Sequence, residues 1–154
     1  MVQALSRSRS RFATALVLCL VLLLSGFATD HARAGEAADR SEMFQLTNEA
    51  RERKDRDLLK LDRQLSRYAV RHSRAMADEG ELFHSRDLAE VLEGRDWSMG
   101  GENVGVGSSL DDLQAAFMAS KVHRSNILKR GYDHAAVGVV ESDGNFWVTV
   151  IFYG

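Results

Sequence analysis

The chain has 154 residues, a length that fits one domain, and its 20 Lys and Arg nearly balance its 22 Asp and Glu. This charge balance offers no basic surface for DNA or RNA, so we expect no nucleic-acid partner. A single cysteine among 154 residues also excludes a disulfide-stabilised scaffold.

The N-terminal segment has the pattern of a secretory signal peptide. Three arginines within the first eleven residues precede an uncharged run from Ala13 to Leu24, and residues 32–34, Ala-Arg-Ala, place small side chains where a signal peptidase cleaves. We therefore expect residues 1–34 to be a signal peptide that carries away Cys19, and the domain to be secreted or held in the cell envelope. The apolar stretch 12–29 is close to the length of about 20 residues that spans a bilayer, so an uncleaved anchor is the alternative.

Without residues 1–34, the mature chain would keep about 120 residues, with 16 Lys and Arg against 21 Asp and Glu. This length supports one modest core. Residues 35–40 are small and polar and are expected to form a linker, so the domain is expected over 41–154.

Helical signals dominate the first half of this domain. Ser41 is a suitable N-cap for a helix that ends near Arg53. Asp62 is expected to cap a second helix, which Gly80 ends. The apolar face of the second helix, spaced by three and four residues, comprises Leu65, Tyr68, Ala69, His72 and Met76. One or two further helical turns are expected over 88–92.

Glycine and capping signals organise the middle of the domain. The glycine-rich segment 99–107 predicts a short strand or an extended loop. Ser109 begins a capping box, which predicts a helix that ends near Ser120. A short turn is expected at 126–128.

The last twenty residues predict a β-hairpin. Two apolar segments, 137–140 and 146–152, flank the sequence Ser-Asp-Gly-Asn at 142–145, which is a strong hairpin turn signal. Helices first and a hairpin last favour an α+β sandwich over a doubly wound parallel sheet.

Three residues at the junctions between predicted elements are candidates for a functional site: His84, Glu102 and His123. Two imidazoles and a carboxylate can bind a divalent metal, ordinarily zinc, with water completing the coordination. The gaps of 18 and 21 residues match no local metal motif. The alternative is that all three side chains only hydrogen-bond the surrounding turns.

The remaining polar residues are weaker candidates for a functional site. His72 lies on an apolar helix face and is expected to be a core histidine with satisfied hydrogen bonds, whereas His134 is expected at the surface. Asn126 is expected to bond the backbone of a tight turn. Ser109 and Ser120 lack a nucleophile motif, so no catalytic residue is assigned.

Several segments, in order along the chain, resemble one known family. Residues 101–103, Gly-Glu-Asn, and residues 123–128, His-Arg-Ser-Asn-Ile-Leu, are similar to signatures of the CAP superfamily (cysteine-rich secretory proteins, antigen 5, pathogenesis-related 1) and of its bacterial SCP-like branch. Further similar segments are 59–62, 72–77, 84–85, 117–120, 137–139 and 147–149. The resemblance covers residues 41–153.

This resemblance implies a three-layer α-β-α sandwich with a small, three-stranded antiparallel sheet between helical layers. It also implies a cleft with two histidines and two acidic residues, which binds a divalent metal in some members. His84, Glu102 and His123 match three of the four, and Ser120 stands where the second acidic residue is expected. The expected site therefore comprises these four residues and Asn126, with His84 and His123 as ligands for zinc or another divalent metal and Glu102 supporting them.

The function expected is that of a secreted or envelope-associated, non-catalytic binding module. Its ligand would be a lipid, a cell-envelope component or an extracellular protein, and membrane contact is expected only through an uncleaved N-terminal segment. The alternative is a metal-dependent hydrolase or peptidase, in which Glu102 acts as general base on water bound by a metal at His84 and His123. A third possibility is a structural role for an envelope-tethered domain.

Overall fold

The protein is described by a computed structural model over residues 34–154. The predicted signal peptide and Cys19 therefore fall outside the described residues, apart from the last position, Ala34. Between residues 34 and 154, no helix is long and apolar enough to cross a membrane.

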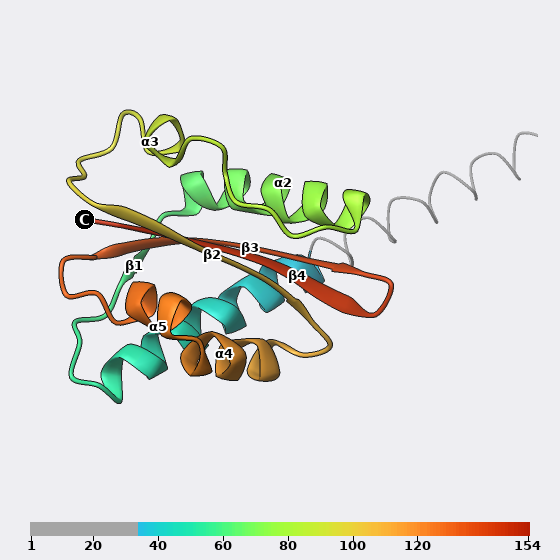
Figure 1. The fold of residues 1–154 in the computed structure, drawn as a ribbon, viewed down its shortest axis with the longest axis horizontal. Coiled ribbons are helices and arrows are strands. Elements are labelled where there is room, and N and C mark those ends of the chain that lie inside the picture. Colours follow the sequence, from blue (N-terminus) through green and yellow to red (C-terminus); the bar gives the residue numbers. More distant parts are fainter. Residues whose placement is uncertain (1–33) are drawn as a thin grey trace, which may run out of the picture. The chain divides into compact units, whose positions relative to one another are not determined.

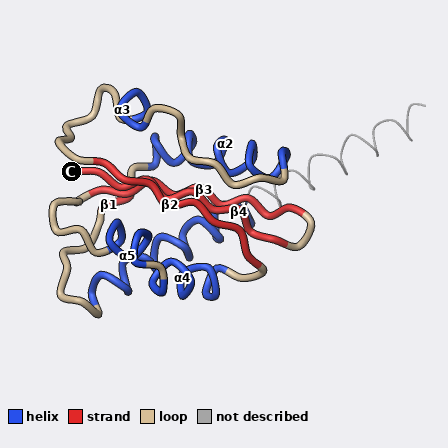
Figure 2. Tube along the Cα trace, in the orientation of Figure 1, coloured by secondary structure: helices blue, strands red, loops and turns tan. Residues whose placement is uncertain are grey.

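The fold has three layers, with one mixed sheet between two layers of helices (Figures 1 and 2). The sheet has four strands in the order β1-β3-β4-β2, with β1 parallel to β3 and the other pairs antiparallel. Along the chain, the elements are a helix over 34–52, β1 (Lys60–Leu61), α2 (Arg63–Glu79), α3 (Leu88–Val91), β2 (Gly100–Gly107), α4 (Leu110–Ala119), α5 (Lys121–Ile127), β3 (His134–Ser142) and β4 (Asn145–Tyr153). The predicted α+β three-layer sandwich is confirmed.

The two helical layers lie on opposite faces of the sheet. Figure 2 shows α2 and α3 on one face, and α4, α5 and the helix over 34–52 on the other. The core on the second face is the larger and includes Met43, Phe117, Val137, Val150 and Phe152, all at most 2% exposed. Because alternate residues of a strand point to opposite faces, both cores draw on the same strands.

The helix α2 has the ends that the sequence predicts. The Asp62 side chain accepts a 2.8 Å hydrogen bond from the backbone N–H of Leu65, and Gly80 ends the helix at φ 66°. Beside the sheet the helix backbone comes very close to β3, because a Cβ on Gly138 would overlap the carbonyl group of Ala69. This close approach fixes α2, and therefore the segment that follows it, against the sheet.

Three local predictions were wrong. Residues 35–40 are helical rather than a linker, so Ser41 lies within the first helix and does not cap it. The sheet has four strands rather than three, because residues 60–61, which the sequence predicts only as the approach to α2, form the strand β1. This strand forms because the backbone N–H groups of residues 60 and 62 donate to the carbonyls of residues 133 and 135. The expected turn at 126–128 is instead the end of α5, a helix separated from α4 by the extended backbone of Ser120 (ψ 126°).

Candidate functional site

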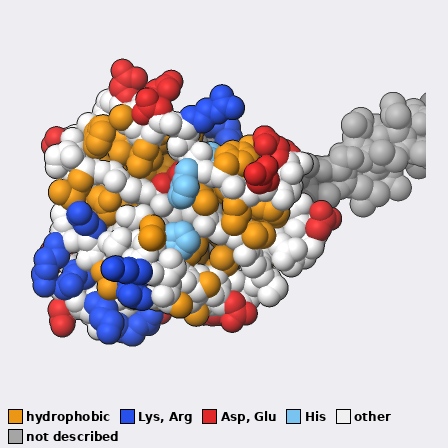
Figure 3. All heavy atoms as spheres, viewed as in Figure 1, with side chains coloured by type: hydrophobic (Ala, Val, Ile, Leu, Met, Phe, Trp, Pro, Cys, Tyr) orange, Lys and Arg blue, Asp and Glu red, His pale blue; other side chains and the backbone are white. Residues whose placement is uncertain are grey.

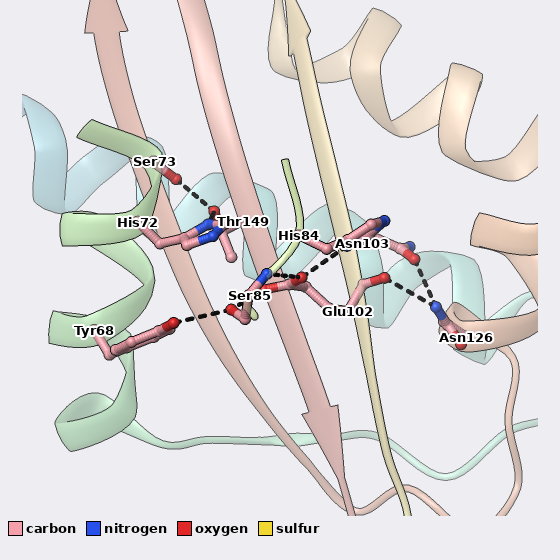
Figure 4. A network of polar contacts seen from close by, with 9 residues as sticks. All are labelled: Tyr68, His72, Ser73, His84, Ser85, Glu102, Asn103, Asn126 and Thr149. Atoms are coloured by element: carbon pink, nitrogen blue, oxygen red, sulfur yellow. Dashed lines mark hydrogen bonds and ion pairs between the residues drawn. The ribbon is translucent and has the colours of Figure 1, made fainter. Parts of the chain in front are cut away.

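The candidate site is built along β2, an edge strand of the sheet, and we call it the β2-edge site: His84, Ser85, Glu102, Asn103, His123 and Asn126. Neighbouring residues of a strand point to opposite faces. Glu102 accordingly contacts the segment between α2 and α3, and Asn103 contacts α5 (Figure 4). The strand thus connects the two helical layers at this point.

Glu102 is the centre of the first contact group. Its side chain is 5% exposed, and its carboxylate accepts three hydrogen bonds. The donors are the backbone N–H of Ser85 at 2.9 Å, the Ser85 hydroxyl at 2.6 Å and, at 2.7 Å, Nδ1 of His84. A buried carboxylate is stable only with such donors, so these bonds account for its position. They also hold His84, whose side chain is 61% exposed, at the surface of the site.

Asparagine side chains form the second contact group, on the other face of β2. The Asn126 amide donates to the backbone carbonyl of Glu102 at 3.1 Å and to Oδ1 of Asn103 at 2.9 Å. Asn103, which is fully buried, donates in turn to the backbone carbonyl of His123 at 3.1 Å. Together these bonds anchor α5 to β2 and place His123 beside the strand.

The two histidines differ in their surroundings. The His123 ring packs edge-on against Phe117, with centroids 5.0 Å apart. Burial lowers the pKa of His123, and the charge of His84 lowers it further. Figure 3 shows histidine side chains near the middle of one face, surrounded mainly by hydrophobic and uncharged groups.

The hydrogen-bond network continues from Ser85 toward α2. The Tyr68 hydroxyl donates to the Ser85 hydroxyl at 3.0 Å. Nearby on the same helix, Nδ1 of His72 lies 3.2 Å from the Thr149 hydroxyl, to which Ser73 donates at 2.9 Å (Figure 4). His72 is buried, as the sequence predicts, but its Nε2 has no hydrogen-bond partner among the described residues. The prediction of a fully satisfied core histidine was therefore wrong.

The described residues do not fit a three-ligand metal centre. Residues 34–154 contain no group of three His, Cys, Asp or Glu side chains that could hold a metal ion. Both carboxylate oxygens of Glu102 are already engaged by Ser85, and one of them also by His84. Nδ1 of His84 is used as well. Binding of zinc at His84 and His123 thus stays a prediction, and we derive no reaction step through it.

The structure brings together four of the five predicted site residues: His84, Glu102, His123 and Asn126. Asn126 lies within α5 and bonds the strand, rather than forming a tight turn. Ser120 lies at the junction of α4 and α5, and its side chain makes no capping hydrogen bond.

Sequence reasoning did not assign Ser85 and Asn103 to the site, although both adjoin predicted residues. The signal that was available is polarity next to a candidate: a hydroxyl beside His84, and an amide beside Glu102 in a strand that is otherwise glycine and valine. His134, expected at the surface, is partly exposed and stacks on Tyr153 at 5.0 Å, away from this site.

Comparisons with known proteins agree with this fold and these motifs. The model of the cysteine-rich secretory protein family, CAP, matches residues 44–152. An uncharacterized protein of Bacillus subtilis (strain 168), YkwD, is 30% identical over 127 residues, which are 77% of this chain and 49% of that protein. The chain therefore spans about half the length of this curated relative.

Solved structures give the same result. An extracellular protein from Bacillus anthracis str. Ames that contains an SCP domain is 27% identical, with a TM-score of 0.70, covering 80% of this chain and 43% of that one. A cysteine-rich secretory protein from Staphylococcus aureus subsp. aureus Mu50 is 25% identical, with a TM-score of 0.65 and coverage of 77% and 39%. With a family match over most of the described residues, the chain belongs to the cysteine-rich secretory protein (CAP) family, as a bacterial SCP-like domain.

Proposed function

We propose that this chain is a secreted or envelope-associated, non-catalytic module that binds an amphipathic lipid of the cell envelope at the β2-edge site. The observation that carries the proposal is the state of Glu102: its carboxylate is buried and fully engaged by hydrogen bonds, so it supports the site instead of acting as a free base. A general base must reach the proton that it removes. Here the site offers a fixed hydrogen-bonding surface.

The exposure of the site supports a binding role. If all three predicted side chains were buried and bonded only to one another, no ligand could reach them. Instead, the His84 side chain is 61% exposed. It can therefore contact a polar head group.

Apolar side chains next to the site suit the rest of an amphipathic ligand. Among residues 34–154, three of the four exposed large hydrophobic residues lie on the segments that carry the site: Leu82, Val106 and Val122, at 42%, 39% and 69% exposure. Exposed apolar groups that gather beside polar ones are typical of interaction surfaces. The fourth, Leu58, precedes β1 at the opposite edge of the sheet.

Secretion is supported by the N-terminal sequence pattern and by relatives. The basic, apolar and small-residue regions of residues 1–34 follow the order of a signal peptide. The Bacillus anthracis neighbour is described as extracellular, and the Staphylococcus aureus neighbour as secretory.

A titration with a water-soluble lipid tests the proposal. Dihexanoyl-phosphatidylglycerol, kept below its micelle concentration, is added to the full-length protein while the ring resonances of His84 and His123 are followed by NMR. We expect both to shift. Val122→Asn should weaken binding about threefold to tenfold, from the loss of one exposed apolar contact. Leu58→Asn is the matched control and should leave binding unchanged.

Two outcomes would contradict the proposal. Equal effects of Val122→Asn and Leu58→Asn would show that the lipid does not bind at the β2-edge site. Lipid binding that leaves the ring resonances of His84 and His123 unshifted would also show that the lipid binds elsewhere. In a parallel titration, micromolar zinc binding that is lost in a His84→Ala/His123→Ala double variant would instead support the predicted metal site.

A further inference from the structure

A groove of about 890 Å³ runs between α2 and the segment 81–95. A volume of this size is typical of small-molecule sites, which hold about 300–1,000 Å³. The residues that line it include the aromatic side chains of Tyr68 and Phe83, the basic side chains of Arg67 and Arg71, and the acidic side chains of Glu81 and Glu90. Only His84 and Ser85 are shared with the β2-edge site.

Aromatic side chains meet within the groove. The His72 ring stacks on Tyr68, with centroids 6.0 Å apart, and meets Phe83 edge-on at 5.2 Å. Such faces bind flat or aliphatic groups by van der Waals contact. They give the groove an apolar surface between its charged walls.

A polar atom among these rings has no partner. His72 is 9% exposed, and its Nε2 forms no hydrogen bond with any residue that the structure describes. Nδ1 of His72 lies 3.2 Å from the Thr149 hydroxyl, so Nε2 is the ring nitrogen left without a partner. A buried polar atom without a partner is unfavourable, and a bound ligand with a complementary hydrogen-bonding group removes that cost.

The walls of the groove carry opposite charges. Arg67 and Arg71 lie one turn apart on α2, whereas Glu81 and Glu90 lie on the facing segment. Over residues 34–154 no ion pair joins any of these four side chains to a partner, and Arg71 lies over the Tyr68 ring. Figure 3 shows Lys and Arg side chains between two groups of acidic side chains on the part of the surface over α2 and α3.

Two other charged residues of the groove already have partners, whereas Glu79 and Arg86, which also line it, form no ion pair within residues 34–154. Arg95 pairs with Asp62 at 2.8 Å, and Asp87 caps α3 through the N–H groups of residues 89 and 90. The charges left free are therefore of both signs. A ligand with a single charge would be attracted by one wall and repelled by the other.

We propose that the groove along α2 binds a short peptide with a free carboxylate and a free ammonium group. The carboxylate would bind Arg67 and Arg71, and the ammonium group Glu81 or Glu90. An apolar side chain would cover Tyr68 and Phe83, and the peptide backbone would form a hydrogen bond with His72 Nε2. This site is additional to the proposed lipid site and does not depend on it.

Calorimetry with a defined peptide tests the inference. A free tripeptide of alanine, phenylalanine and alanine, whose only charges are its terminal ammonium and carboxylate groups, is titrated into the full-length protein, beside the same peptide with both ends blocked. We expect the free peptide to bind and the blocked one to bind at least threefold more weakly. The double variant Arg67→Gln/Arg71→Gln should lose about twofold to thirtyfold in affinity, because two exposed ion pairs with the carboxylate are removed.

Arg63→Gln is the matched control, because Arg63 lies on the same helix but does not line the groove. It should leave affinity unchanged. A second readout is the ¹⁵N resonance of His72 Nε2, which should shift as its hydrogen bond forms. Nonspecific charge attraction would leave that resonance unchanged.

Three results would overturn the inference: no binding at millimolar peptide, equal binding of the blocked peptide, or equal losses in the Arg67/Arg71 and Arg63 variants. A third variant, His123→Ala, separates this site from the lipid site. If His123→Ala abolishes peptide binding while the arginine variants do not, the peptide binds at the β2-edge site and the groove is not its site.

Discussion

A buried arginine joins the first helix to the segment after α5. Arg51 is fully buried, and its guanidinium donates four hydrogen bonds to backbone carbonyls. The acceptors are the carbonyls of residues 57, 127, 129 and 132, at 2.7–3.0 Å. Three of them, at residues 127, 129 and 132, belong to the end of α5 and the loop beyond it. We expect this side chain to stabilise the helix that carries His123 and Asn126.

The substitution Arg51→Met tests this role, because it keeps the apolar stem and removes the donors. A hydrogen bond to a charged group contributes about 1.5–3 kcal/mol, so four give roughly 6–12 kcal/mol. Burial of the guanidinium costs several kcal/mol and is also the main cause that lowers the pKa of Arg51. The difference predicts a loss of about 2–4 kcal/mol in the free energy of unfolding.

Urea unfolding of the full-length protein, followed by tryptophan fluorescence, measures this loss. Arg53→Met is the matched control, since the Arg53 side chain is 63% exposed. It should change stability by less than about 0.5 kcal/mol. In Arg51→Met, amide hydrogens of α5 should also exchange faster. If the Arg51 and Arg53 variants unfold at the same urea concentration, the four hydrogen bonds do not stabilise the fold and the reasoning is refuted.

Three further predictions concern the sheet and the site. Gly138→Ala should destabilise the domain by about 3 kcal/mol in thermal unfolding, because its Cβ overlaps the Ala69 backbone; a loss below about 1 kcal/mol would show that α2 can shift. Glu102→Ala should cost about 1–3 kcal/mol in urea unfolding, because three donors lose their acceptor; an unchanged curve would mean that the carboxylate is not structural. Burial, reinforced by the His84 charge, lowers the pKa of His123 below its usual 6.5, so the unfolded chain binds this proton first. Stability should therefore fall as the pH drops below about 6.5, and His123→Gln should reduce that fall; identical profiles would contradict this.

The parts of the fold that the sequence predicts well depend on local chemistry. Asp62 and Ser109 cap their helices through bonds to N–H groups three residues away. The hairpin turns at Asp143 and Gly144, where both residues adopt positive φ, as the Asp-Gly sequence predicts. Each of these features is settled by residues within one or two turns of the chain. The family motifs are similarly local, and they are sufficient to identify His84, Glu102 and His123 as candidates.

The features that the sequence did not predict depend on contacts between distant residues. The strand β1 has two residues and exists only because β3, more than seventy residues later, offers it a free edge. Arg51 lies in a charged segment that looks solvent-exposed in the sequence, yet its bonds reach 76 to 81 residues along the chain.

The candidate site likewise has properties that the sequence determines and properties that depend on the tertiary structure. The sequence determined which residues are candidates, because their types and motifs are visible in it. Only the tertiary structure decided that both carboxylate oxygens of Glu102 accept hydrogen bonds from Ser85 and His84. These donors lie 17 and 18 residues away in the sequence, and they reach Glu102 only when α2 is packed on the sheet. A carboxylate in a sequence has no fixed partners, and its chemistry depends on the donors that folding brings to it.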